Sequence, residues 1–303
     1  MQQRISLADV LAMFRLDGES RGFTAATLRF YAGRLGLFQE WCTAHNVTML
    51  DQLTPALIRQ YLAELQNRQP PLSSAYIHSL ARAIKTLCRF CAREELIDRS
   101  CFDRVKMPRL AKKVLPALTI DEVQALLDAC SHERDKAMIL FLLDSGVRAT
   151  ELCNLDVGDV QPDGSVTVRQ GKGRKDRQAF IDVRTRKQLL RYFTLERGGK
   201  PAASEPLFTA LRGSEGKGRL TYFGFAQVLK VLRKRTGVEH CSPHAFRRTF
   251  AINSLRSGMD LYTLARLMGH ADIQVLRVYL DQLPEDIEVA AKKHGVVDHL
   301  LKK

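Results

Sequence analysis

Apolar residues recur at helical spacing through the first hundred residues of the chain. The pattern forms successive runs at residues 7–14, 28–42, 58–65 and 77–91. Residues suited to cap or start a helix stand before three of these runs, namely Ser6 with Asp9, Thr54 with Pro55, and Ser73 or Ser74. The spacing and the caps together predict a compact domain of four helices over residues 1–98.

The helical spacing fails between Asp98 and Ala117. Basic residues alternate there with prolines, as in Arg104, Lys106, Pro108, Arg109, Lys112, Lys113 and Pro116. Proline cannot continue a helix, so this composition predicts an extended basic linker over residues 99–117. A solvated tether is the plain interpretation, and such a strand can also lie along phosphates.

A second domain is expected over residues 118–283. Thr119 and Glu122 form a capping box, and the nearly all-apolar run 137–143 predicts a buried helix that ends at Gly146. Alternating residues at 166–169 and 178–183, on either side of a glycine-rich turn, predict a hairpin. The pattern is helical again through Tyr279. The fold class is therefore mainly α with a small antiparallel β element.

The last segment, residues 284–303, has an apolar face without partners of its own. Its apolar positions are Ile287, Ala290, Ala291, Val297 and Leu301. An isolated helix of this length is marginal in water, so we expect the tail to dock on another part of the protein or on another copy.

The charge of the chain narrows its class of partner. It carries 47 Lys and Arg against 33 Asp and Glu, a formal net charge of +14. This excess indicates a polyanionic partner, with nucleic acid ahead of an anionic membrane surface, although solubility alone would also explain it. We find no apolar run of the roughly 18 residues that a membrane span needs and no secretory signal pattern.

Seven cysteines lie mostly inside amphipathic runs. Cys88 and Cys91 have the CxxC spacing but no second pair, so core thiols are favoured over redox or zinc chemistry. Cys241 and His244 likewise lack the matching pair of a zinc site. A reducing, cytoplasmic location fits this usage.

Four short segments of the second domain carry residues suited to chemistry on phosphate. They are Gly146–Leu152 with Arg148, Gly171–Arg177 with Lys172, Ser242–Thr249 with His244 and Arg247, and Leu267–Tyr279 with His270. In this order they resemble the motifs of the tyrosine recombinases, most closely the Xer-like and phage-integrase branch. The family pattern has six catalytic positions, filled here by Arg148, Lys172, His244, Arg247, His270 and Tyr279. The resemblance covers nearly the whole chain.

The resemblance implies a helical, SAM-like core-binding domain followed by an integrase-type catalytic domain. It implies a site-specific recombinase that breaks and rejoins DNA through a 3′-phosphotyrosyl intermediate on Tyr279 and exchanges strands through a Holliday junction. It further implies double-stranded half-sites as substrate, a homotetramer on DNA, a tail that enters the neighbouring protomer, and no cofactor. A partner recombinase or an accessory DNA-bending protein is compatible with it.

Physical chemistry supports the same roles. The transition state of phosphoryl transfer spreads negative charge over its non-bridging oxygens, which two guanidiniums, Arg148 and Arg247, can hold. A tyrosine with a pKa near 10 becomes a nucleophile only where cations favour the phenolate, and His270 would add to that field. Lys172 is the candidate acid for the leaving 5′ oxygen, and His244 would assist as acid or base.

Two further sets of residues are expected to support the reaction. Glu151 follows Arg148 by one helical turn and is expected to orient it or a histidine. The candidates for DNA contact are Arg82, Lys85, Arg89, Lys106, Arg109, Lys112, Lys113, Arg174 and Lys175.

Each of these residues alone has a plainer explanation. Arg148 would be a helix-end charge, Lys172 a hairpin-turn residue and Tyr279 a core aromatic. Three alternatives to a recombinase remain open: a type IB topoisomerase-like enzyme, a catalytically silent integrase-like DNA-binding regulator, and a basic membrane-surface protein. The ordered set of six positions favours the recombinase.

Overall fold

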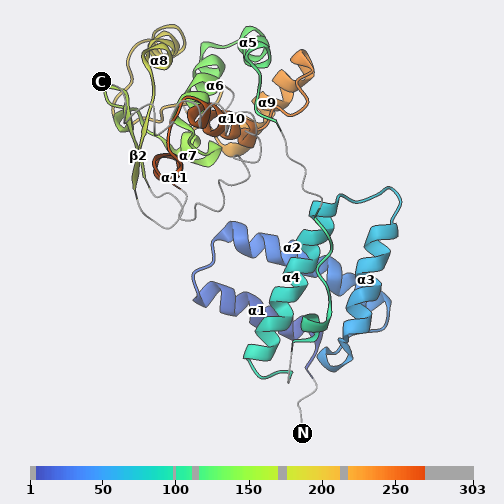
Figure 1. Ribbon diagram of the computed structural model, residues 1–303. Coiled ribbons are helices and arrows are strands. Elements are labelled where there is room, and N and C mark those ends of the chain that lie inside the picture. The colour runs from blue at the N-terminus through green and yellow to red at the C-terminus, as the bar shows by residue number, and fades with distance from the viewer. Residues whose placement is uncertain (1–4, 98–99, 111–115, 170–175, 212–217, 270–303) are drawn as a thin grey trace, which may run out of the picture. The chain divides into compact units, whose positions relative to one another are not determined.

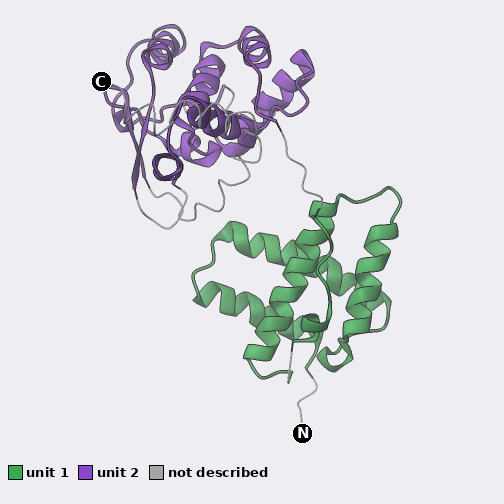
Figure 2. Cartoon of the chain, viewed as in Figure 1, with its two compact units in different colours: residues 1–113 green, residues 114–303 purple. Residues whose placement is uncertain are grey.

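The computed structural model describes residues 5–97, 100–110, 116–169, 176–211 and 218–269. The chain divides into two compact units, residues 1–113 and 114–303 (Figure 2). Each unit has its own hydrophobic core. Within the described ranges, no helix is long and apolar enough to cross a membrane.

The first unit contains the expected helices. They are α1 (Leu7–Ser20), α2 (Ala25–Ala44), α3 (Pro55–Asn67) and α4 (Ser74–Arg93), with a short 3-10 turn η1 (Leu50–Gln52) before α3 (Figure 1). The side chains of Ser6, Thr54 and Ser73 accept hydrogen bonds from backbone N–H groups of the first turns, which confirms these three predicted starts. Thr24 caps α2 in the same way.

Helix α4 is the centre of this unit. It contacts α1, α2 and α3, and one of its faces is buried over its whole length. The buried residues are Ile77, Leu80, Ala81, Ala83, Ile84, Leu87, Cys88, Phe90 and Cys91. Cys88 and Cys91 are therefore core residues, as their apolar surroundings in the sequence predicted.

The basic segment expected as a linker over 99–117 is not extended throughout. Residues Cys101–Arg104 form a 3-10 helix, η2, that packs against α3 and α4. Phe102 and Val105 are 1% and 7% exposed and belong to the core of the first unit. The expectation of an extended chain was wrong here because two apolar side chains three residues apart outweigh the prolines and charges around them. The first unit consequently extends beyond residue 98.

The second unit consists mainly of helices around α6. Its elements are α5 (Ile120–Asp128), α6 (Glu133–Ser145), α7 (Ala149–Asn154), η3 (Val157–Asp159), β1 (Ser165–Val168), β2 (Arg177–Phe180), α8 (Val183–Glu196), α9 (Tyr222–Thr236), α10 (Pro243–Arg256) and α11 (Leu261–Met268). Helix α6 packs against α8, α10 and α7 (Figure 1). Its residues Phe141 and Leu142 are fully buried. The predicted apolar helix is thus the core element of this unit.

The hairpin is present as a two-stranded antiparallel sheet. Val166 faces Ala179 and Val168 faces Arg177 in its register. The second strand ends at Phe180, three residues earlier than the pattern predicted, because Asp182 caps α8 by accepting the N–H of Val183. The start of α8 at its cap therefore sets where β2 ends.

Gly146 ends α6 in a conformation that needs glycine. Its φ is +60°, and an added Cβ would lie 2.2 Å from the Phe250 ring. A side chain here would be both strained and blocked. The sharp turn fixes how the chain leaves α6 and enters the segment that carries Arg148.

Candidate active site

Arg148 is the N-cap residue of α7, two residues after the turn at Gly146. Its side chain is 25% exposed, and its Nη1 donates to Glu151 Oε1 at 2.8 Å. The backbone N–H of Arg148 donates to the other carboxylate oxygen, Oε2, at 2.7 Å. Glu151 thus holds both the backbone and the guanidinium of Arg148.

Helix α10 supplies the second arginine. Ser242 caps this helix and Pro243 occupies its first turn, so His244 and Arg247 lie one turn apart near its start. His244 is exposed, whereas Arg247 is 5% exposed. The two Nη atoms of Arg247 donate to the carbonyl oxygens of Gly146 and Met268. Arg247 therefore connects the turn before Arg148 with the end of α11.

The end of α11 is where the arginines meet. The carbonyl of Met268 accepts from Arg247, and the carbonyl of Gly269 accepts from Arg148 Nη2 at 3.4 Å. The last carbonyls of a helix lack intrahelical partners and carry partial negative charge, which suits cationic donors. The structure thereby brings Arg148 and Arg247, 99 positions apart in the sequence, to adjacent carbonyls.

A third arginine, Arg177, completes this arrangement. It is the first residue of β2, its side chain is 10% exposed, and its Nε donates to the carbonyl of Leu267 at 2.9 Å. Its Nη2 donates to Glu151 Oε2 at 2.8 Å. Arg177 is the last residue of the motif segment Gly171–Arg177, but the sequence analysis assigned it no role. Strand alternation offered a signal, because Arg177 shares a face with the buried Ala179.

The carboxylate of Glu151 stays ionised in this setting. Burial acts to raise its pKa, but the hydrogen bond from the Arg148 backbone and the charges and hydrogen bonds of Arg177 and Arg148 outweigh that effect. The pKa of Glu151 is therefore below its ordinary value of 4.5. An anion fixed between two guanidiniums reduces their mutual repulsion and holds both in place.

Three of the six motif positions, Lys172, His270 and Tyr279, lie outside the described residues. The same is true of Lys112, Lys113, Arg174 and Lys175, and of the tail from Pro284. The described part of the site is accordingly Arg148, His244 and Arg247 with the two supporting residues Glu151 and Arg177.

The described candidates for DNA contact lie in the first unit. Arg82, Arg89, Lys106 and Arg109 are exposed, and Lys85 is half-buried. The Arg82 guanidinium lies 5.3 Å from the Phe30 ring centre, and the Lys85 Nζ lies 5.9 Å from that of Phe102. Arg34, which was not among the DNA-contact candidates, stacks on Phe30 and on Tyr76, with 4.4 Å to the Tyr76 ring centre.

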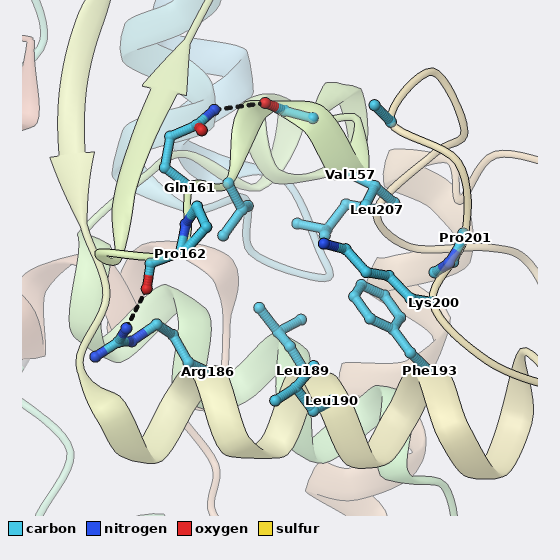
Figure 3. Close-up of a pocket in the computed structure, with 13 residues that line it drawn as sticks. Val157, Gln161, Pro162, Arg186, Leu189, Leu190, Phe193, Lys200, Pro201 and Leu207 are labelled. Carbon is cyan, nitrogen blue, oxygen red and sulfur yellow. Dashed lines mark hydrogen bonds between the residues drawn. The ribbon is translucent and has the colours of Figure 1, made fainter.

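The second unit also has a pocket of about 670 Å³ lined by none of the motif residues (Figure 3). Leu189 and Phe193 of α8 form one wall, and Lys200 extends over them. Arg186 closes one end by donating to the carbonyl of Pro162. None of the residues that line this pocket is Arg148, Arg177 or Arg247.

Comparison with known families matches both units of the chain. The model of the phage integrase family matches residues 116–286, and that of the phage integrase N-terminal SAM-like domain matches residues 19–95. The chain belongs to the phage integrase family. The matched catalytic segment of this integrase contains all six motif positions and both supporting residues.

Curated relatives of this integrase are tyrosine recombinases. XerC of Myxococcus xanthus is 31% identical over 297 residues, which cover 93% of this chain and 96% of the relative. XerA of Pyrococcus horikoshii is 28% identical over 301 residues, with 99% and 98% of the two chains covered.

Solved structures share the fold. A Tn1549 transposon integrase in complex with transposon right end DNA has a TM-score of 0.75 at 17% identity, covering 96% of this chain and 100% of that one. A lambda integrase tetramer bound to a Holliday junction has a TM-score of 0.70 at 16% identity, covering 88% and 78%. Both expected domains, SAM-like and integrase-type, are confirmed.

Proposed function

We propose that this protein is a tyrosine-type site-specific recombinase in which Arg148 and Arg247 hold the scissile phosphate and Tyr279 attacks it. The observation that carries the proposal is the meeting of the two guanidiniums at the end of α11, directly before His270 in the sequence. A guanidinium has five N–H donors, so the bonds of Arg148 to Glu151 and to the Gly269 carbonyl fix its position and leave it further donors for a phosphate.

The other motif residues take the remaining steps. Attack by Tyr279 on phosphorus forms a 3′-phosphotyrosyl bond and expels the 5′ oxygen, which takes a proton from Lys172. His244, exposed in the first turn of α10, and His270 assist the proton transfers. Two fixed guanidiniums supply the charge stabilisation that a metal would otherwise give. The phosphotyrosyl bond conserves the energy of the phosphodiester, so rejoining needs no nucleotide cofactor.

The substrate is double-stranded DNA carrying two half-sites. The net charge of +14 and the exposed basic residues of the first unit suit a phosphate backbone. Structural neighbours include integrases bound to DNA and a tetramer on a Holliday junction. By analogy we propose a homotetramer on DNA that exchanges strands through a Holliday junction, with a partner recombinase or a DNA-bending protein as optional additions.

The proposed tail contact links protomers. Deleting residues from Pro284 onward should leave binding to one half-site intact but weaken cooperative assembly on two half-sites and recombination, because the docking contact made by the apolar positions of the tail is removed. A gel-shift series on one and two half-sites measures this. Loss of single half-site binding would instead assign the tail to the fold of its own subunit.

We place the enzyme in a reducing cytoplasm. All seven cysteines are free thiols, and six of them are buried. A compartment that keeps thiols reduced fits this state.

A nicked suicide substrate tests the proposed nucleophile. The wild-type protein should become covalently linked to the 3′ phosphate, and Tyr279→Phe should abolish the adduct while DNA binding persists. An adduct in the Phe variant would remove Tyr279 from the role. Binding without an adduct in the wild type would favour a silent DNA-binding regulator, and relaxation of supercoiled DNA without a second site would favour a topoisomerase.

A modified substrate tests Lys172. Lys172→Ala should slow cleavage of the normal phosphodiester, and a substrate with a 5′-bridging sulfur should restore the rate because a thiolate leaves without a proton. Failure of the sulfur to restore cleavage would remove Lys172 from the role of general acid.

A further inference from the structure

Three consecutive carbonyls at the end of α11 each accept a hydrogen bond from a different arginine. Leu267 accepts from Arg177, Met268 from Arg247 and Gly269 from Arg148. Two of these arginines are the proposed phosphate ligands. The third, Arg177, comes from β2, is 10% exposed and is not one of the six motif positions.

Resting on the function proposed above, we propose that Arg177 is a positioning residue, which holds Arg148 and the end of α11 in one fixed arrangement for cleavage. It acts through two contacts of its guanidinium, one to Glu151 and one to Leu267.

The contact to Glu151 fixes Arg148 indirectly. Glu151 Oε2 accepts both the backbone N–H of Arg148 at 2.7 Å and Arg177 Nη2 at 2.8 Å, while Oε1 accepts Arg148 Nη1 at 2.8 Å. A carboxylate with donors on both oxygens has one favourable orientation. Without Arg177, both remaining donors belong to Arg148 itself, so nothing outside this segment anchors the carboxylate, and Glu151 and the Arg148 guanidinium can move together.

The contact to Leu267 fixes the segment that leads to His270. Gly269 has a φ of +63°, and a Cβ placed there would lie 2.8 Å from Arg177 Cδ. The arginine therefore packs directly on the turn that ends α11, at a position where only glycine leaves room. A shift of about 1 Å in a reacting group can cost about a hundredfold in rate, so a support at this turn matters for catalysis.

Arg177 also occupies the point where the chain re-enters the sheet. It pairs with Val168 in the register of β1 and β2 and follows Lys172 by five residues. One side chain thus connects β2, which follows Lys172 in the sequence, the carboxylate that orients Arg148, and the end of α11. Its Nη1 is buried and has no hydrogen-bond acceptor among the described residues.

Arg197 provides a matched control within the same unit. Its side chain is 9% exposed, its Nη2 donates to Glu205 at 2.8 Å and its Nη1 donates to the carbonyl of Pro206 at 3.0 Å. The type and length of the contacts match those of Arg177. Both partners of Arg197, however, lie within nine residues of it in the sequence, and neither is a motif residue.

The test compares Arg177→Ala, Arg177→Lys and Arg197→Ala in the full chain. Single-turnover cleavage of the suicide substrate at saturating DNA, the Kd for DNA and the Tm are measured for each. Arg177→Ala should cleave about tenfold or more slowly with an unchanged Kd, and Arg177→Lys should recover part of the rate. Arg197→Ala should lower the Tm by less, because Glu205 is 43% exposed against 9% for Glu151, and it should cleave at the wild-type rate. Equal rates for Arg177→Ala and the wild type, or equal slowing by Arg197→Ala, would overturn the proposal.

Two further readouts separate positioning from a structural role. Among the described residues, the charged side chains that contact Glu151 are Arg148 from α7 and Arg177 from β2. Loss of Arg177 removes a positive charge beside Glu151, so Glu151 should become protonated at a higher pH. The fall of the cleavage rate on the acid side of the pH profile should therefore move to higher pH in Arg177→Ala and stay in place in Arg197→Ala. Hydrogen exchange of the Arg148 amide should accelerate in Arg177→Ala without any DNA, and unchanged exchange would refute the proposal even if the protein were not a recombinase. Absence of an adduct from the wild type would refute the recombinase function alone.

Discussion

Arg82 of the first unit and the arginines of the candidate site in the second unit are held by different kinds of group. In the first unit the exposed Arg82 lies over the Phe30 ring, and the half-buried Arg34 stacks on Tyr76 while its Nε donates to Ser79 Oγ at 3.1 Å. In the second unit Arg247 and Arg177 are nearly buried and donate to backbone carbonyls. A ring contact uses the face of a guanidinium and leaves its N–H edge available, whereas a carbonyl contact uses the edge and fixes the group. The first arrangement suits a surface that adapts to DNA, and the second suits a site that is formed before DNA arrives.

The largest expected effect is on the fixed arginines. Arg247→Ala and Arg148→Ala should each lower the cleavage rate by about a hundred- to a thousandfold, on the scale of losing a preorganised oxyanion donor. The Kd for DNA should change little, because the first unit and the remaining cations still bind. Single-turnover cleavage beside gel-shift titration measures both quantities.

Arg247→Lys is the control for a folding defect in Arg247→Ala. It keeps a charge that can reach one of the two carbonyls, so the fold should persist while cleavage stays low. If all these variants lost DNA binding and cleavage to the same extent, the arginines of the second unit would not be specific to cleavage, and the comparison between the two units would be wrong.

The adaptable arginines should show the opposite behaviour. Arg82→Ala should weaken DNA binding by about tenfold, the value of one charge-assisted contact, and reduce the salt slope by about one unit, while cleavage at saturating DNA stays normal. Arg93→Ala is the control, since Arg93 is already paired with Asp17 at 2.7 Å and Glu94 at 3.0 Å. An equal effect of both substitutions would show that binding depends on exposed charge alone, and not on whether a guanidinium has an ion-pair partner among the described residues.

Lowering the pH protonates Glu151 in the second unit and Asp17 in the first unit. Protonation of Glu151 should destabilise its unit more than protonation of Asp17 destabilises the first unit. Burial opposes ionisation at both, but hydrogen bonds and charges from arginines keep the pKa of each carboxyl below its ordinary value. A carboxyl with a lowered pKa stabilises the fold above its unfolded pKa, and this stabilisation is lost as the pH falls through the folded pKa.

The free energy of unfolding of Glu151→Gln and of Asp17→Asn, measured between neutral pH and about pH 3, tests this order. Each variant should lose the part of the pH dependence that its carboxyl contributes, and the loss should be larger for Glu151, which is 9% exposed against 19% for Asp17. A larger loss for Asp17→Asn would contradict the comparison.

The smallest expected effect concerns the thiols. Burial raises the pKa of Cys130 to about 12 and of Cys241 to about 11 in the second unit. In the first unit, a hydrogen bond between the sulfurs of Cys101 and Cys88, 3.1 Å apart, lowers the pKa of Cys101, which is half-buried. Cys101 should therefore react first with iodoacetamide, as peptide mass spectrometry would show, and Cys101→Ser should remove the fast phase. Earlier labelling of Cys241 would contradict this order.

Much of the fold could be predicted from the sequence because its determinants are local. The caps at Ser6, Thr54, Ser73 and Thr119 stand where the sequence placed them, since a hydroxyl and a backbone N–H three residues on define such a cap. The apolar helix ending at Gly146 was also predictable. The folding of Phe102 and Val105 onto the first unit was not, because their burial depends on α3 and α4, which are far away in the sequence.

The candidate site divides in the same way. The sequence by itself determined which residue types stand in which order, and with them the family and the six motif positions. Only the tertiary structure decided that the carbonyls of residues 267–269 receive Arg177, Arg247 and Arg148. Those contacts join β2, α10 and α7 to the end of α11. A helix end attracts any donor that packing brings within reach, and its amino-acid sequence does not specify which donor that is.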